Sequence, residues 1–386
     1  MAGELLVAGG GIGGLAAALA ARKAGWEAQV FEQADALSEA GAGIQLGPNV
    51  TRILGEWGLL RGEFAARASR PSRLLVRDAL TGAQLGQLPF SDFESRYGAP
   101  YLTVHRVDLQ ATLLRAAEAA GVRLHTGRKV GEIVEIGRGV RVETLPGPAV
   151  EGEALVGADG LWSTVRTFVA GSEAPRVSGH LAYRGLVPGV RQQEVTVWLA
   201  PAMHLVTYSV RGGECLNVVC VVEGQVDGDP RAWDHEALAA NLETAAGTVC
   251  GEAREVLRSV PAWRLWALHD RPAVAGPEGM ARGRVALLGD AAHPMRPYLA
   301  QGAGMAIEDA RWLQQVLSVT DDRVLDVPTA LRRYALDRWQ RAARVQRKSE
   351  RNGVIFHAAG PLRLSRNIAM RALGGSLLDQ PWLYGE

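Results

Sequence analysis

The glycine pattern near the N-terminus could bind the diphosphate group of a dinucleotide. Gly9, Gly11 and Gly14 form a GxGxxG motif between an apolar run and an Ala- and Leu-rich segment. Such glycines allow a tight turn, let a diphosphate approach the backbone and let helix and strand pack closely. Glu32 ends the next expected strand, where a carboxylate can bond ribose hydroxyls. The pattern predicts a site for FAD or NAD without distinguishing between them.

A second motif, GADGLWSTVR at 157–166, places an acidic residue at the end of a strand. Asp159 enters a turn there, and a helix begins near Ser163 or Thr164. The residues alone also describe a plain Asp-Gly turn followed by a helix cap.

A third motif occupies residues 284–310. A buried strand ends at Asp290, whose carboxylate could bond a polyol chain. Gly302 and Ala303 then open a long helix, and the amides at its start could stabilise negative charge on a reduced isoalloxazine ring. Asp309 could merely serve the electrostatics of this helix.

His204 and Tyr208 lie in a segment that reads as a strand. Their even offset places both side chains on one face, with Val206 between them. Their Cα atoms are then about 13 Å apart at ~3.3 Å per residue, so the two side chains could flank a ring. From the residues alone, the more ordinary interpretation is a buried tyrosine and a hydrogen-bonded histidine within a sheet.

The elements that must position these residues alternate in type at the start of the chain. An expected strand at 4–8, a helix at 12–24 and a strand at 28–32 form a βαβ unit, which requires a parallel sheet covered on both faces. Further on we expect a glycine-rich loop at 41–49 with a helix after it to Leu54, a hairpin at 73–90, a helix at 107–120, and strands at 122–125, 130–136, 139–144 and 154–156.

The middle of the chain differs from its two ends. Between about 180 and 222 only strands are expected, which predicts an antiparallel sheet inserted into the first domain. Helices at 233–245 and 250–258, a strand at 284–288, and two long helices at about 302–318 and 328–358 complete the chain.

A chain of 386 residues is long enough for two domains. We therefore predict a mixed α/β fold with a Rossmann-like nucleotide-binding domain, an inserted antiparallel-sheet domain and long C-terminal helices. The predicted boundaries are 1–72, 98–178 and 270–386 for the first domain, and 73–97 and 179–269 for the second.

Composition excludes several classes of protein. The formal net charge is +1, and 47% of residues are apolar. The arginines of the last long helix, from Arg338 to Arg347, are expected mostly on its solvated face. The composition therefore indicates no nucleic-acid partner. Three cysteines exclude a disulfide scaffold and offer no metal-ligand spacing, so we predict no metal site. The run from Leu5 to Ala21 is short and glycine-rich for a membrane span, and a reduced cytoplasmic setting fits.

Taken together, the motifs resemble the FAD-dependent aromatic hydroxylases, the class A flavoprotein monooxygenases. GGGIGG at the start, HRVDL at 105–109, GADG at 157–160 and GDAAHP at 289–294 occur in the family's order across nearly the whole chain. The resemblance implies non-covalently bound FAD. It also implies that Asp159 serves FAD and the nicotinamide nucleotide, that Asp290 contacts the ribitol, that Arg106 contacts FAD, and that the strand start near Val130 lies by the adenine. From the residues alone, Arg106 is a surface arginine that caps a helix.

Within this family, residues 41–49, 203–219 and 298–310 look most like the hydroxylases of 3-hydroxybenzoate, salicylate and 6-hydroxynicotinate. Those enzymes use a His-x-x-x-Tyr pair around the substrate, so the resemblance implies that His204 and Tyr208 are catalytic. Gln45, Arg184 and Tyr298 are further candidates for substrate contact. The chain departs from these relatives at Arg296-Pro297-Tyr298, which leaves the substrate open.

The resemblance implies that NAD(P)H and O2 are used to hydroxylate a small aromatic or N-heteroaromatic hydroxy acid through a flavin C4a-hydroperoxide. A related FAD-dependent reductase or oxidase without oxygen insertion is the alternative, and a non-enzymatic FAD-binding protein is another. The choice between NADH and NADPH, the regiochemistry, the loss or retention of a carboxylate, and assembly as a homodimer are left open by the sequence.

Overall fold

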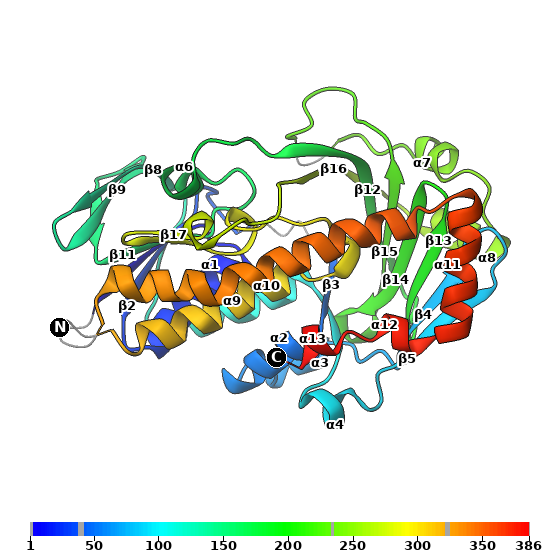
Figure 1. The fold of residues 1–386 in the computed structure, drawn as a ribbon, viewed down its shortest axis with the longest axis horizontal. Helices are drawn as coiled ribbons and strands as arrows, with labels where there is room; N and C mark the ends of the chain where they lie inside the picture. Colours follow the sequence, from blue (N-terminus) through cyan, green and yellow to red (C-terminus); the bar gives the residue numbers. More distant parts are fainter. Residues whose placement is uncertain (1–2, 38–41, 233–234, 321–324, 386) are drawn as a thin grey trace. The chain divides into compact units, whose positions relative to one another are not determined.

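The computed structural model describes residues 3–37, 42–232, 235–320 and 325–385. Backbone proximity divides the chain into two compact units (Figure 1). Unit 1 comprises Met1–Ala40, Leu109–Pro175 and Arg271–Ser349, and unit 2 comprises Gly41–Asp108, Arg176–Asp270 and Glu350–Glu386. Each unit is assembled from three separate stretches of sequence.

Unit 1 is built on a six-stranded sheet in the order β17-β18-β11-β1-β2-β7, in which only the β17–β18 pair is antiparallel. These strands are β1 (Glu4–Ala8), β2 (Glu27–Phe31), β7 (Arg123–His125), β11 (Ala154–Gly157), β17 (Ala281–Arg282) and β18 (Val285–Leu287). Apart from Glu4 at its start, β1 is apolar and buried, as is all of β11, because a parallel sheet is covered on both faces. Helix α1 (Ile12–Lys23) follows β1 and packs against α9 (Gly302–Leu317), so the predicted βαβ unit is confirmed.

A small antiparallel sheet, β10-β9-β8, completes the strands of unit 1. Its members are β8 (Lys129–Ile136), β9 (Gly139–Leu145) and β10 (Val150–Gly152), and the helices of this part of the chain are α5 (Arg106–Ala119), α6 (Thr164–Ala170) and α10 (Val327–Phe356). The predicted solvated face of α10 is wrong for Arg338, which is only 1% exposed. Its charge is neutralised by Asp309 and Glu308, whereas Arg344 and Arg347 are exposed as expected.

Unit 2 contains a seven-stranded sheet in the order β16-β12-β15-β14-β13-β4-β5, which is antiparallel except between β13 and β4. The strands are β4 (Arg73–Asp78), β5 (Gln84–Pro89), β12 (Arg176–Pro188), β13 (Val195–Ala200), β14 (Met203–Val210), β15 (Cys215–Glu223) and β16 (Arg264–Asp270). One face packs Leu205 and Val218 against helices α7 (Ala239–Ala246) and α8 (Gly251–Ser259). The opposite face carries Val76 and Leu199, which pack against Met370.

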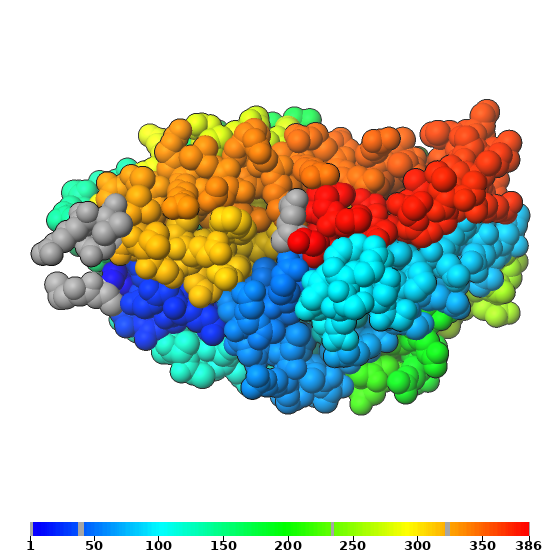
Figure 2. Space-filling model, turned by 60° about the horizontal axis from the view of Figure 1, so that its bottom comes forward, coloured from blue at the N-terminus to red at the C-terminus, as the bar shows by residue number. Residues whose placement is uncertain are grey.

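The remaining elements of unit 2 frame this sheet. They are β3 (Gly43–Leu46), which pairs with β6 (Leu102–His105), and the helices α2 (Pro48–Glu56), α3 (Gly62–Arg67), α4 (Phe93–Tyr97), α11 (Gly360–Leu373), α12 (Gly375–Leu378) and α13 (Pro381–Tyr384). In Figure 2 the C-terminal helices lie beside the segment that contains β5 and α4. Within the described ranges, no helix combines the length and the apolar character that crossing a membrane requires.

Three expectations about elements need correction. The predicted helix at 233–245 begins only at Ala239; residues 233–234 lie outside the described part, and His235 bridges to Leu265. The strand at 264–270 was not predicted, because its apolar residues, Leu265–Leu268, are consecutive and show no alternation. The predicted last helix is followed, within the described residues, by α11 with 14 residues and by the short helices α12 and α13.

The compact units also differ from the predicted domain boundaries. Residues 42–72, 98–108 and 350–385 belong to unit 2, whereas the boundaries predicted from sequence place them with the nucleotide-binding domain. The cause is pairing between distant segments: β3 pairs with β6, and α11 and α12 pack against β5.

Candidate active site

The glycine motif of unit 1 has the geometry that its sequence predicts. Gly9 has a φ of +101°, and a Cβ there would lie 2.4 Å from the carbonyl oxygen of Ala158. A Cβ on Gly14 would lie 1.8 Å from the carbonyl oxygen of Gly9, so only glycine allows this close packing of helix on strand. A Cβ on Gly11 would meet nothing within 4 Å. The backbone at Gly11 therefore faces open space, which a diphosphate could enter.

The Glu32 carboxylate is held beside this motif. One oxygen accepts a hydrogen bond from the Gly10 amide at 2.7 Å, and the other accepts one from the Ala34 amide at 2.9 Å. Gln110 donates to the Gly10 carbonyl at 3.0 Å. A carboxylate has about four acceptor positions, so Glu32 retains capacity for ribose hydroxyls.

Asp159 caps helix α6. Its carboxylate accepts hydrogen bonds from the Ser163 hydroxyl at 2.5 Å and from the Thr164 and Val165 amides at 2.8 and 3.2 Å. Burial raises the pKa of this carboxyl, although the hydrogen bonds oppose the shift. These contacts match the helix-cap interpretation, and a role of Asp159 toward a cofactor stays a prediction.

A buried ionic network supports the turn that carries Asp290. Asp290 itself is exposed in the short 3-10 turn Gly289–Ala291 after β18, whereas Asp309, which bonds this turn at Gly289, is completely buried. Asp309 accepts hydrogen bonds from the Gly289 amide at 3.0 Å, from His293 Nε2 at 2.6 Å and from Arg338 Nε at 2.7 Å. The sequence did not predict this role for His293 or Arg338. The only signal was that His293 lies in the GDAAHP segment and Asp309 in the IEDA segment.

The start of α9 presents an uncapped helix terminus. Gly302 and Ala303 are its first two residues, the first turn contains no acidic residue, and Gln301 makes no capping hydrogen bond with its side chain. A Cβ on Gly302 would meet nothing within 4 Å. Because exposed amides at a helix start attract negative charge, this terminus can bind an anionic group.

Three other predicted residues have surroundings that do not by themselves indicate a ligand. Val130 is buried at the start of β8, so a contact with adenine would have to come from its backbone. Tyr298 is buried in the short 3-10 turn Pro297–Leu299 of unit 1. Arg106 is exposed at the first position of α5, and its amide donates to the Ala42 carbonyl at 3.1 Å. Cofactor contact and a helix-start role both remain open for Arg106.

In unit 2, His204 and Tyr208 share one face of the large sheet. Strand pairing places Tyr208 opposite Asn217, and Val206 opposite Val219, which pairs in turn with Arg184. Val206, Val219 and Arg184 are partly exposed, while His204 and Tyr208 on either side of them are buried. The three form a small accessible row between the histidine and the tyrosine.

Several polar side chains surround Tyr208. Gln45 hydrogen-bonds the Tyr208 side chain, and its Oε1 accepts a hydrogen bond from the Tyr101 hydroxyl at 2.8 Å. Asn217 Oδ1 accepts from the Gly43 amide at 2.7 Å. Sequence reasoning missed Tyr101 and Asn217; the asparagine could have been found as a single polar residue within the apolar run LNVVCVV.

Two buried donors next to Tyr208 lack an acceptor among the described residues. They are Nε of Arg184 and Nδ2 of Asn217. Burial lowers the pKa of the Arg184 guanidinium, and its charge lies over the Trp266 ring at 5.1 Å. Buried donors without an acceptor are costly, so the pair favours a ligand that brings acceptor oxygens, such as a carboxylate.

His204 contacts the end of α10. Its Nδ1 lies 2.9 Å from Nε2 of His357, and its ring packs edge-on against Phe356. Burial, together with the neighbouring His357 and His180, lowers the pKa of His204 well below its usual range. The imidazole is therefore neutral near pH 7.

The sequence matches the family described as FAD binding domain over residues 3–349. It is 38% identical to 3-hydroxybenzoate 6-hydroxylase of Polaromonas naphthalenivorans (strain CJ2), across 99% of this chain and 95% of that protein. It is 37% identical to 6-hydroxynicotinate 3-monooxygenase of Bordetella bronchiseptica (strain ATCC BAA-588 / NCTC 13252 / RB50), across 90% of this chain and 91% of that one.

Among solved structures, the chain is similar to Klebsiella pneumoniae HpxO complexed with FAD and uric acid. The TM-score is 0.86 at 25% sequence identity, and the match covers 97% of this chain and 94% of HpxO.

Proposed function

Because this chain belongs to the FAD binding domain family of flavoprotein aromatic monooxygenases, we propose that it hydroxylates a small aromatic acid that carries a ring hydroxyl. It is an NAD(P)H-dependent enzyme with FAD as its cofactor. Two relatives act on aromatic acids with a ring hydroxyl, as their names state, which supports the same class of substrate here.

The residues of unit 1 fit FAD. The open backbone at Gly11 suits the diphosphate, Glu32 suits a ribose, and the uncapped start of α9 at Gly302 suits the electron-rich edge of the flavin ring. Asp290 is the proposed partner of the ribitol chain, and its turn is held by the network around Asp309. When bound, FAD supplies the redox chemistry, accepting hydride from NAD(P)H and reacting with O2.

The accessible row beside Tyr208 is the single observation that carries the proposed substrate class. The apolar side chains of Val206 and Val219 can pack against an aromatic ring. The unpaired Nε of Arg184 can donate to the carboxylate of such an acid, and Nδ2 of Asn217 offers a second donor. Binding an aromatic acid here would satisfy both buried donors at once.

We further propose that His204 accepts the proton of the ring hydroxyl and that Tyr208 orients the substrate. His204 is neutral, and its Nδ1 lies 2.9 Å from Nε2 of His357. A neutral imidazole has one unprotonated ring nitrogen, which can accept the ring proton directly or through water. Tyr208, raised in pKa by burial, stays protonated and orients the substrate by hydrogen bonding.

The test is a panel of hydroxybenzoic and hydroxypyridine carboxylic acids, each paired with its neutral amide. We expect one or more acids to stimulate NAD(P)H oxidation and to gain one oxygen atom from labelled O2, while the matching amides bind poorly. Stimulated oxidation without labelled product would instead support a reductase or oxidase without oxygen insertion. Amides that perform as well as the acids would exclude the proposed role of Arg184.

A further inference from the structure

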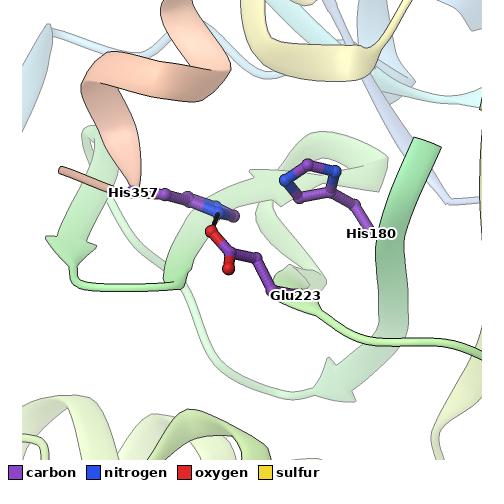
Figure 3. A group of neighbouring side chains, drawn as sticks. All are labelled: His180, Glu223 and His357. Carbon is purple, nitrogen blue, oxygen red and sulfur yellow. Dashed lines mark hydrogen bonds and ion pairs between the residues drawn. The ribbon is translucent and has the colours of Figure 1, made fainter.

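A cluster of three side chains with metal-binding atoms lies in unit 2, and one of them, His357, contacts His204 (Figure 3). His180 comes from β12, Glu223 ends β15, and His357 follows α10. Each contributes one ligand atom, and these atoms all lie within 4.8 Å of one another. We propose that the cluster binds one divalent transition-metal ion, with Zn²⁺ as the best match.

The backbone aims His180 at this position. A bulge interrupts β12 between Val177 and Leu181, and Gly179 within it has a φ of +75°. The bulge places His180 directly opposite Glu223 on the paired strand β15. Bulges commonly re-aim a side chain beside a functional site. His357 is held from its own side, because its carbonyl accepts a hydrogen bond from the Ala202 amide at 3.4 Å.

The spacing of two ligand atoms already matches a zinc ion. Ligands at ~2.0–2.2 Å from a tetrahedral zinc lie roughly 3.3 Å from each other. Nδ1 of His357 and Oε1 of Glu223 are 3.3 Å apart and hydrogen-bonded, and a bound ion would replace this hydrogen bond. Figure 3 shows a ring nitrogen of His180 facing this pair, so a small rotation of its side chain completes the set.

Hydrogen bonds at the other ring nitrogens favour the tautomers that a metal needs. Nδ1 of His180 lies 2.9 Å from the Ser178 carbonyl oxygen and donates its proton there, which leaves Nε2 with its lone pair for an ion. A metal on Nδ1 of His357 leaves the proton on Nε2, which then donates to His204 at 2.9 Å. Metal-bound histidines usually donate their second N–H to such an acceptor.

The chemistry of the donors selects the kind of ion. Two imidazoles and one carboxylate suit zinc and its neighbours, whereas Mg²⁺ and Ca²⁺ prefer oxygen ligands alone. The Glu223 side chain is 53% exposed, so an ion can enter from solvent and water can supply a fourth ligand. The three residues are far apart in sequence, which explains why spacing along the chain predicted no metal site.

The test measures metal binding to the FAD-loaded enzyme without an affinity tag. After treatment with chelator and a check that the flavin spectrum is unchanged, Zn²⁺ is titrated by calorimetry. Co²⁺ is then followed by its absorption at wavelengths longer than those of the flavin. We expect one ion per chain and a tetrahedral Co²⁺ spectrum. Loss of a residue that only hydrogen-bonds a metal ligand typically weakens metal binding about 10–100-fold. His180→Ala and Glu223→Gln each remove a ligand, so each should weaken Zn²⁺ binding by at least this factor.

His269→Ala is the matched control. His269 lies on the neighbouring strand β16, and its Nδ1 likewise contacts a main-chain carbonyl, that of Ala267, at 3.1 Å. It lies outside the cluster, so its loss should leave Zn²⁺ affinity unchanged. The proposal is overturned if no stoichiometric binding occurs, or if His180→Ala and Glu223→Gln bind Zn²⁺ as His269→Ala does.

Discussion

At the scale of single residues, His204 combines a buried position with a neutral ring. His204→Ala should leave the flavin spectrum unchanged and lower hydroxylation by ~10²–10⁴-fold, the usual contribution of a positioned acid–base group. Hydrogen peroxide should increase as product falls, because reduced flavin still reacts with O2. Product yield and peroxide per NAD(P)H consumed measure both effects.

Leu205→Val provides the control on the adjacent residue. Leu205 is completely buried in the apolar cluster on the opposite face of the sheet, so its shortening should cost packing and leave coupling intact. Wild-type rate and coupling in His204→Ala, with uncoupling in Leu205→Val, would show that the other face of β14 serves the substrate.

Two glycines of the N-terminal motif should respond differently to a side chain. Gly11→Val places its side chain in open space, so the folded protein should keep its stability within ~0.5 kcal/mol but lose FAD and its yellow colour. Gly14→Ala instead forces a Cβ against the Gly9 carbonyl and should destabilise the fold by at least about 1–3 kcal/mol. Flavin absorbance and urea unfolding distinguish the two, and a yellow Gly11→Val protein would contradict the assigned diphosphate site.

At the scale of elements, α9 and α10 are joined by buried charges. Arg338 of α10 is paired with Asp309 and Glu308 of α9 at 2.7 and 3.0 Å. Arg338→Leu leaves two buried carboxylates without this partner and should cost about 3–5 kcal/mol in the free energy of unfolding. Arg344→Leu, on the exposed side of the same helix, should change stability by less than ~0.5 kcal/mol. Equal denaturation midpoints for the two variants would refute the buried network.

The same network predicts how stability depends on acid. Burial of Asp309 opposes ionisation, but His293, Arg338 and the Gly289 amide outweigh it and lower its pKa from 3.8 to about 2. A carboxyl whose pKa is lower in the folded state stabilises the protein above its unfolded pKa and loses that effect as pH falls toward its folded pKa. Asp309 should therefore contribute about 2 kcal/mol above pH 4, lost between about pH 4 and pH 2. Unfolding followed across this range should show a shallower acid limb in Asp309→Asn.

At the scale of the whole molecule, the described ranges contain one parallel sheet with one glycine-rich motif of the kind that binds nucleotide phosphates. FAD uses that motif in the proposed function, so NAD(P)H lacks a second site of this kind to occupy at rest. Flavin reduction should therefore be slow in the free enzyme and faster once an aromatic acid is bound. Stopped-flow reduction rates that are identical with and without every active acid of the panel would contradict this gating.

Much of the fold follows from local patterns. The βαβ unit at the N-terminus, the hairpin at 73–90 and the strands between 180 and 222 were all predicted because each depends on short-range periodicity and turn residues. The shared face of His204 and Tyr208 also follows from the two-residue period of a strand. The predicted helix that contains α7 starts too early, and strand β16 was missed because its apolar residues are consecutive and do not alternate.

By itself, the sequence determined which residues could bind a dinucleotide, because the roles of Gly9, Gly11 and Gly14 depend on the backbone of one short segment. Only the tertiary structure decided which charged and polar side chains are partners. Arg338 is buried rather than solvated because Asp309 lies beside it, and His180 faces His357 because a bulge and a helix end converge. Burial of a charge is tolerable only next to an opposite charge, and residues distant in sequence become such neighbours only when the chain folds.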